Sequence, residues 1–89
     1  MIEQKIEIIN KLGLHARAAA KLVSTAANFS SQITLSFGQQ EADAKSIMSV
    51  MMLAAAQGST ILIKCDGSDE KNAMTALTDL INTYFGEDE

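Results

Sequence analysis

The alternation of apolar and polar residues in short segments is the feature of this chain that most restricts its fold. Residues 2–9 and 32–37 alternate with the period of a strand that has one dry face, and residues 60–65 are predicted as a further strand. Gly38 predicts a tight turn into a short polar strand at 40–43. A sheet whose strands are solvent-exposed on one face needs helices to cover the other face only. The pattern therefore predicts a four-stranded antiparallel sheet covered on one face.

The segments between these strands have helical composition and spacing. A helix rich in alanine is predicted at 16–27, and Ser46 is a good N-cap for a short, almost wholly apolar helix at 47–53. Ser68 is predicted to cap a third helix with one apolar stripe. That stripe consists of Ala73, Leu77, Leu80, Ile81 and Tyr84. The element order is βαββαβα, which predicts an α+β domain.

A single domain covering residues 1–89 is expected, because no repeat, linker or low-complexity segment interrupts the chain. A domain of this size buries only about 60% of the surface that its unfolded chain exposes, so any site must lie near the surface. The apolar runs are too short to cross a bilayer, and the N-terminus lacks the pattern of an export signal. We therefore expect a soluble cytoplasmic protein that does not associate with membranes.

Charge and cysteine content argue against several classes of function. The net charge is -4 and no basic or aromatic cluster is present, which argues against nucleic-acid binding and favours proteins or small anions as partners. Cys65 has no second cysteine to pair with, and it is expected to be a buried thiol without a role. One histidine and one distant cysteine do not make a metal site, and no glycine-rich phosphate loop is present. The chain is therefore expected to hold no metal and no cofactor.

The single histidine, His15, stands where the first predicted helix begins. A neutral imidazole can act as a nucleophile toward phosphorus, and a helix N-terminus would stabilise the phosphoryl group placed on the ring. The amides of Ala16 and Arg17 are the expected donors, and the Arg17 guanidinium can make bidentate contacts to phosphate oxygens. Gly13 permits unusual dihedral angles in the approaching loop, and the small Ala20 leaves room for a partner. Position alone leaves open that His15 is an ordinary surface histidine.

Two blocks of the sequence are similar to those of a known family. The first block is Gly13-Leu14-His15-Ala16-Arg17, which resembles the active-site signature of HPr, the histidine phosphocarrier family of the bacterial phosphoenolpyruvate-dependent phosphotransferase system. The second block is Lys45-Ser46-Ile47-Met48-Ser49-Val50-Met51-Met52-Leu53, which resembles the regulatory serine region of that family. The resemblance extends over the whole chain. It implies the HPr-like open-faced β-sandwich, with three helices on one face of the sheet.

The resemblance implies a role for each matched residue. His15 would accept a phosphoryl group on Nδ1 from Enzyme I and pass it to an EIIA-type protein, so the chain would be a carrier and not a free-standing enzyme. Arg17 would assist the transfer. Ser46 would be phosphorylated by HPr kinase/phosphorylase, although N-capping alone predicts the same serine.

The second predicted helix has more apolar residues than one buried stripe needs. Val50 and Leu53 are assigned to the core, and part of the remainder is assigned to a docking patch, since methionine adapts to several partner shapes. The predicted patch consists of Ile47, Met48 and Met51 with Ala16, Ala20 and Ser24 of the first helix. A transient carrier with a small docking face needs no stable oligomer, so a monomer is expected.

One departure from the family pattern bears on the pathway. Ala18 follows Arg17 where many family members have proline, and alanine is an excellent helix former at that position. GLHARAAAK, MMLAAAQG and the acidic tail Phe85-Gly86-Glu87-Asp88-Glu89 together resemble the HPr and NPr proteins of Gram-negative bacteria whose system is mainly regulatory. The alternative function is therefore a regulatory interaction module, whose output is partner binding controlled by phosphorylation instead of sugar uptake.

Overall fold

The computed structural model describes residues 1–86, which form four strands, three helices and a final 3-10 turn. The strands are β1 (Ile2–Glu7), β2 (Gln32–Phe37), β3 (Gln40–Asp43) and β4 (Thr60–Asp66). The helices are α1 (Ala16–Ala26), α2 (Ile47–Met52) and α3 (Glu70–Asn82), and the 3-10 turn η1 is Tyr84–Gly86. The predicted order βαββαβα is confirmed. The acidic residues 87–89 lie outside the described residues.

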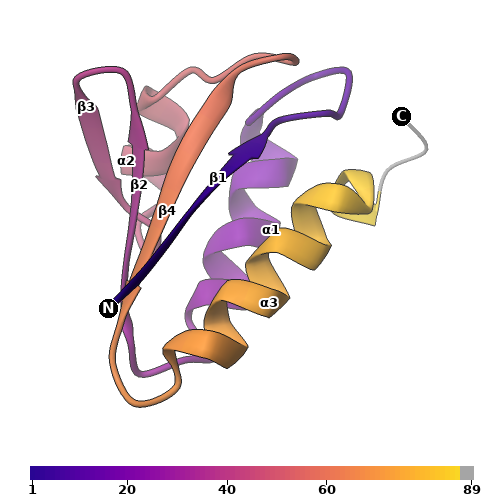
Figure 1. Cartoon of the computed structure of the whole chain (residues 1–89). Helices are drawn as coiled ribbons and strands as arrows, with labels where there is room; N and C mark the ends of the chain where they lie inside the picture. The colour runs from indigo at the N-terminus through magenta and orange to yellow at the C-terminus, as the bar shows by residue number, and fades with distance from the viewer. Residues whose placement is uncertain (87–89) are drawn as a thin grey trace.

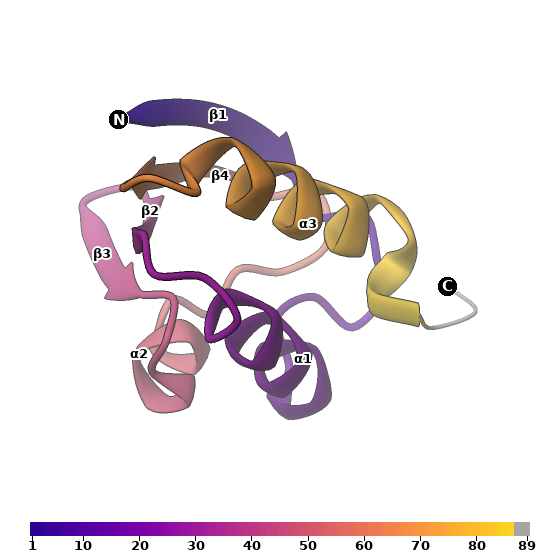
Figure 2. The same cartoon turned by 90° about the horizontal axis from the view of Figure 1, so that it is seen from below.

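The strands form one antiparallel sheet in the order β1-β4-β2-β3. The three helices cover one face of this sheet, and the other face is open (Figure 1). Helix α3 packs against β1 and β4, while α1 and α2 lie side by side (Figure 2). The predicted α+β open-faced β-sandwich is confirmed. None of the helices in residues 1–86 has the length and apolar character that a bilayer-spanning segment needs.

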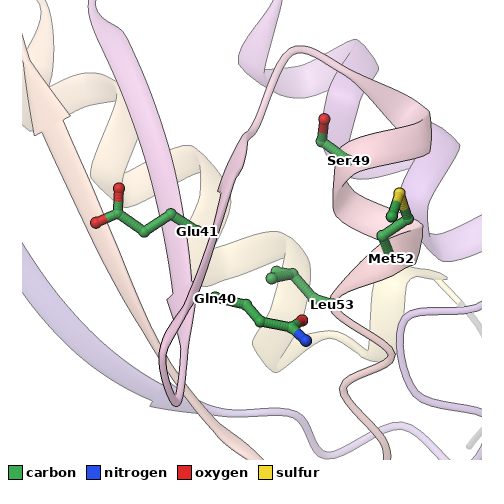
Figure 3. Close-up of a pocket in the computed structure, with 5 residues that line it drawn as sticks. All are labelled: Gln40, Glu41, Ser49, Met52 and Leu53. Carbon is green, nitrogen blue, oxygen red and sulfur yellow. The ribbon is translucent and has the colours of Figure 1, made fainter.

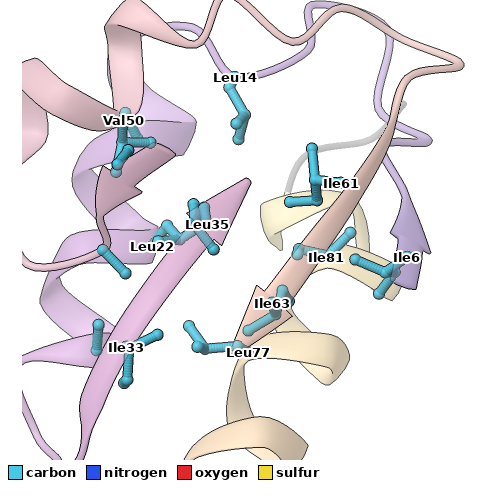
Figure 4. Close-up of a cluster of buried hydrophobic side chains, with 14 of the residues drawn as sticks. Ile6, Leu14, Leu22, Ile33, Leu35, Val50, Ile61, Ile63, Leu77 and Ile81 are labelled. Carbon is cyan, nitrogen blue, oxygen red and sulfur yellow. The ribbon is translucent and has the colours of Figure 1, made fainter. Parts of the chain in front are cut away.

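The alternation along the strands produces the core. The inward positions of β2 and β4 are buried while their neighbours are not, and Leu22 and Leu77 reach them from α1 and α3. Figure 4 shows these side chains in one cluster. The large aliphatic residues buried on the strands are Ile6, Ile33, Leu35, Ile61 and Ile63. Full burial of one such side chain stabilises the fold by about 1.5–3 kcal/mol, so the alternation decides which face of the sheet the helices cover.

The C-terminal end of the last helix differs from the prediction. Helix α3 ends at Asn82, and Tyr84 is exposed instead of continuing the apolar stripe. Tyr84 and Phe85 have φ angles of 60° and 54°, and this left-handed turn buries Phe85 completely. Lys21 of α1 donates from Nζ to the Phe85 carbonyl at 2.6 Å. Burial of the aromatic ring beside α1 outweighs the cost of about 1–2 kcal/mol for each left-handed residue.

Three other elements end one or two residues before their predicted ends. Strand β1 ends at Glu7, α1 at Ala26 and α2 at Met52. Ile8 leaves the strand but stays buried, and its N–H donates to the Ser59 carbonyl at 2.8 Å. The strand therefore ends before its apolar pattern does, although Ile8 stays bonded to the segment just before β4.

The start of α3 was also predicted wrongly, because its N-cap is Asp69 and not Ser68. The Asp69 carboxylate accepts hydrogen bonds from the Ser30 N–H at 2.8 Å, the Ser31 N–H at 3.0 Å and the Ser31 hydroxyl. Asp69 thus joins the turn before α3 to the turn after α1. These bonds, led by the one from the Ser31 hydroxyl, lower the pKa of Asp69 from 3.8 to about 2.

We expect Asp69→Asn to lower the free energy of unfolding at pH 7 and to lose this effect in acid. The folded-state pKa of Asp69 lies below its unfolded value, so the carboxylate stabilises the fold above about pH 4, and this contribution disappears as the pH falls toward 2. Urea unfolding of both proteins between pH 7 and pH 2 measures the difference. Asp79→Asn, on the exposed side of α3, is the matched control. A difference that stays constant down to pH 2 would contradict this linkage.

The lone cysteine lies in the core, as predicted. Cys65 is fully buried on β4, with its side chain on the helix-covered face. Burial raises the pKa of its thiol, and the negative charges of Glu70 and Asp69 raise that pKa further. The thiol therefore stays protonated at neutral pH and packs as a small apolar group.

Candidate functional site

The loop before α1 is held in place by hydrogen bonds. Asn10 is fully buried, and its Nδ2 donates to the Gly13 carbonyl at 2.8 Å, while the Gly13 N–H donates to the Asn10 carbonyl at 3.1 Å. The Leu14 N–H donates to the Ala55 carbonyl at 2.9 Å, and the Leu14 side chain is buried. The loop therefore packs against the segment that follows α2, and this contact fixes where α1 begins.

Gly13 occupies a position in this loop that excludes a larger residue. Its φ is 66°, in the left-handed region, which confirms the predicted unusual dihedral angle. A Cβ atom would lie 2.6 Å from the Ala55 carbonyl oxygen and 2.9 Å from Ala56 Cα. Both the backbone conformation and the available space therefore require glycine. The approach to Ala55 has no signal in the sequence, because it joins distant segments.

His15 is the N-cap residue of α1. Its backbone is extended, with φ of -75° and ψ of 177°, and its carbonyl accepts the Ala19 N–H at 2.8 Å. Its side chain is half-buried and does not cap the first turn. The amides of that turn, which include those of Ala16 and Arg17, have no acceptor within the helix. They and the helix dipole form a positive end, beside which a negative group bonded to the imidazole would be stabilised.

The other residues predicted on the first helix lie on its surface. Ala16, Arg17 and Ser24 are exposed, and Ala20 is half-buried. Ala16, Ala20 and Ser24 are spaced by four residues, so they share one face of α1. Ala18 is fully buried in the first turn, where its small side chain faces the core.

Helices α1 and α2 run antiparallel. Lys45, just before α2, donates from Nζ to the carbonyl of Phe29, just after α1, at 2.7 Å. At the other end, Leu14 is bonded to Ala55, which follows α2. His15 therefore lies beside the end of α2, whereas Ser46 lies beside the end of α1. Helix α2, which is about 9 Å long, lies between these two ends.

Ser46 is the N-cap of α2, as predicted. Its hydroxyl accepts the Ser49 N–H at 3.3 Å, and its own backbone is extended. A cap of this kind contributes about 1 kcal/mol to stability. The capping role accounts for a serine at this position whether or not it is phosphorylated.

Exposed apolar side chains lie on α2. Ile47 and Met51 are 43% and 38% exposed, and Met48 is 69% exposed. Val50 and Leu53 are buried. The predicted division of this helix into core and surface residues is therefore confirmed, while the docking role of the surface residues stays a prediction.

Sequence reasoning missed two exposed apolar residues near His15 and on α2. Leu12 is 67% exposed in the loop before His15, and Met52 is 73% exposed on α2. Met52 follows Met48 by four residues, which places both on one helix face and could have identified it. A large apolar residue in a loop, such as Leu12, is a weaker signal. The α1–α2 face, defined as the predicted patch with Leu12 and Met52, is larger than the sequence indicated.

The charges near the α1–α2 face differ in sign from the net charge of -4. Neither α1 nor α2 contains an aspartate or glutamate. Four of the 7 lysine and arginine residues lie on α1 or just before α1 and α2. These are Lys11, Arg17, Lys21 and Lys45. This part of the molecule therefore suits a partner with an acidic surface.

A groove of about 400 Å³ lies between β3 and α2, and His15 does not line it. Its lining residues are Gln40, Glu41, Ser49, Met52 and Leu53. Figure 3 shows Gln40 and Leu53 turned toward one another and the Glu41 carboxylate turned away from α2. Without a cationic lining residue the groove does not suit a phosphoryl group. The candidate site is instead the accessible start of α1.

These features define a class of small α+β domain whose single histidine stands at a helix start near the surface. The family model described as PTS HPr component phosphorylation site matches residues 2–83. The chain belongs to this family, the HPr phosphocarrier proteins of the phosphotransferase system.

Individual relatives agree with this assignment. The chain is similar to phosphocarrier protein HPr from Neisseria meningitidis and to that from Cupriavidus necator. Each is 56% identical over 89 residues, and each match covers the whole of this chain and the whole of the relative. It is also similar to the crystal structure of HPr-C-His from Thermoanaerobacter tengcongensis, with a TM-score of 0.96, 48% identity and complete coverage of both chains.

Proposed function

We propose that this chain accepts a phosphoryl group on His15 Nδ1 from phosphorylated Enzyme I and passes it to an EIIA-type protein. The observation that carries the proposal is the position of His15, which is the N-cap residue of α1 and lies beside an exposed, apolar and locally cationic face. Membership of the HPr family supports the choice of partners. The chain acts in the cytoplasm as a monomer, since a shared face for two successive partners must stay uncovered.

The proposed transfer uses the helix start at each step. The Nδ1 lone pair attacks phosphorus, the P–Nδ1 bond forms, and the bond from phosphorus to the donor's leaving atom breaks. The amides of Ala16 and Arg17 donate to the phosphoryl oxygens, and the Arg17 guanidinium offsets their charge. In the second step a nucleophile of the acceptor attacks phosphorus, and breaking the P–Nδ1 bond restores His15. The chain is thus a carrier without an independent turnover reaction.

Labelling with phosphoenolpyruvate tests the proposal. The chain is incubated with labelled phosphoenolpyruvate and a catalytic amount of Enzyme I, and we expect acid-labile, alkali-stable phosphate on His15. Sugar-type and nitrogen-type EIIA proteins are then added separately, and the one that takes up the label identifies the branch. Absence of the labelled phosphohistidine would reject the carrier function. Label that forms but moves to neither acceptor would favour the regulatory interaction module.

The α1–α2 face is proposed to dock both partners, and Met48 is the variant that tests it. Met48→Ala is expected to raise the KM for phosphorylation by Enzyme I about 3- to 10-fold, because Met48 offers a large exposed apolar surface to a partner. The kcat and the free energy of unfolding should change little. Leu62→Ala, on the open face of the sheet, is the control and should leave KM unchanged. Equal KM values for both variants would place the docking surface elsewhere.

Phosphorylation of Ser46 by HPr kinase/phosphorylase is proposed as the regulatory modification. A phosphate adds a charge of about -2 at the start of α2, and this would repel an acidic partner without touching His15, which lies beside the other end of that helix. We expect label from ATP on Ser46, loss of label in Ser46→Ala, and retention in Ser68→Ala. The increase in KM for Enzyme I that phosphorylation causes should be larger at low salt than at high salt. Equal labelling of Ser46→Ala and the wild-type chain would reject Ser46 as the modified residue.

A further inference from the structure

We infer that Asn10 is a positioning residue for phosphoryl transfer at His15. The inference rests on the proposed function, because it concerns the same histidine. Asn10 lies outside the HPr signature block and has no role in the chemistry itself. Its side chain is fully buried, where an amide must be placed to make hydrogen bonds.

The effect of Asn10 is transmitted through one peptide unit. The carbonyl of Gly13 and the N–H of Leu14 belong to the same planar peptide. That carbonyl accepts Asn10 Nδ2 at 2.8 Å, and that N–H donates to the Ala55 carbonyl at 2.9 Å. A peptide plane bonded at both of its polar atoms cannot rotate without breaking a buried hydrogen bond. The plane is therefore fixed one residue before His15.

This fixed plane determines where the imidazole stands. Only Leu14, whose side chain is buried, lies between this peptide plane and His15. The orientation of the plane therefore sets the direction of the chain at the start of α1. Asn10 holds the plane from the loop side, and Ala55 holds it from the segment after α2. The position of the imidazole is thus fixed relative to the first-turn amides of α1 and to the end of α2. Phosphoryl transfer depends on such alignment, since a shift of about 1 Å can cost about 100-fold in rate.

The test separates positioning from stability. Asn10→Ala removes the donor, and we expect kcat for phosphorylation by Enzyme I to fall about 10- to 100-fold while KM stays within about two-fold. The rate at which the phosphorylated protein hydrolyses in the absence of its partners, followed by ³¹P NMR, should also differ from the wild-type rate. Ile33→Val lowers stability from β2, far from the loop, and should leave all three values unchanged. Wild-type kcat and hydrolysis rates in Asn10→Ala would overturn the inference.

Two further measurements cover other outcomes. If Asn10→Ala does not fold, Asn10→Gln keeps the amide but displaces the donor by one methylene, and the same kcat loss is expected. In the wild-type protein, amide hydrogen exchange at Leu14 should be as slow as in β4, and rapid exchange would overturn the inference. Failure of the wild-type chain to form phosphohistidine would instead reject the proposed function.

Discussion

His15→Ala is expected to accept no detectable phosphoryl group from phosphorylated Enzyme I, a loss of at least about 10⁴-fold in rate. The imidazole Nδ1 supplies the lone pair that forms the bond to phosphorus, and alanine has no atom that replaces it. The side chain is half-buried and does not cap α1, so the free energy of unfolding should change by less than about 1 kcal/mol. Rapid-quench measurement of acid-labile phosphate gives the rate, and urea unfolding gives the stability.

The matched control for this variant is Thr75→Ala on the exposed side of α3, which should accept phosphate at the wild-type rate. Arg17→Lys gives a graded comparison, because lysine keeps the positive charge but loses the bidentate geometry. Its rate should fall between those of the wild type and His15→Ala. Acid-labile phosphate that persists in His15→Ala would place the reactive group on another residue.

The strand pattern in the sequence predicts most of the fold, because burial in this chain follows local periodicity. Ile33 and Leu35, two residues apart, both face the core. Ser46 caps α2 through a hydrogen bond to Ser49, only three residues further along the chain. Both features depend on short-range geometry that the sequence contains. The end of α3 could not be predicted in this way, since Phe85 leaves the helical period to reach α1. Its burial depends on tertiary packing and not on local propensity.

The site divides in the same manner. The position of His15 at a helix start follows from the local sequence, and the exposure of Met48 follows from an excess of apolar residues in a short helix. The support for His15 does not follow from the sequence. It comes from Asn10 within the loop and from Ala55, which is brought next to Gly13 only when α1 and α2 pack antiparallel. The position of the reactive side chain and the exposure of the docking residues therefore depend on local sequence, whereas the alignment of the imidazole depends on tertiary contacts.

Gly13→Ala is expected to destabilise the protein by about 2–4 kcal/mol and to disable the site in the molecules that remain folded. A left-handed φ of 66° costs alanine about 1 kcal/mol, and the added Cβ would lie 2.6 Å from the Ala55 carbonyl oxygen. Because the neighbouring atoms are backbone, the loop itself must move away from the segment after α2. The Leu14 hydrogen bond to Ala55 is then lost, and the start of α1 shifts.

Gly38→Ala separates the two contributions, because Gly38 has a similar φ of 62° but a Cβ added there would meet no heavy atom within 4 Å. It should lose only about 1 kcal/mol, the cost of the backbone conformation alone, and should accept phosphate at the wild-type rate. Urea unfolding and phosphorylation by Enzyme I are measured for both variants. If both lose the same stability, the contact with Ala55 contributes nothing. If Gly13→Ala keeps the wild-type kcat, the loop does not align His15, and the support for the imidazole must come from α1 alone.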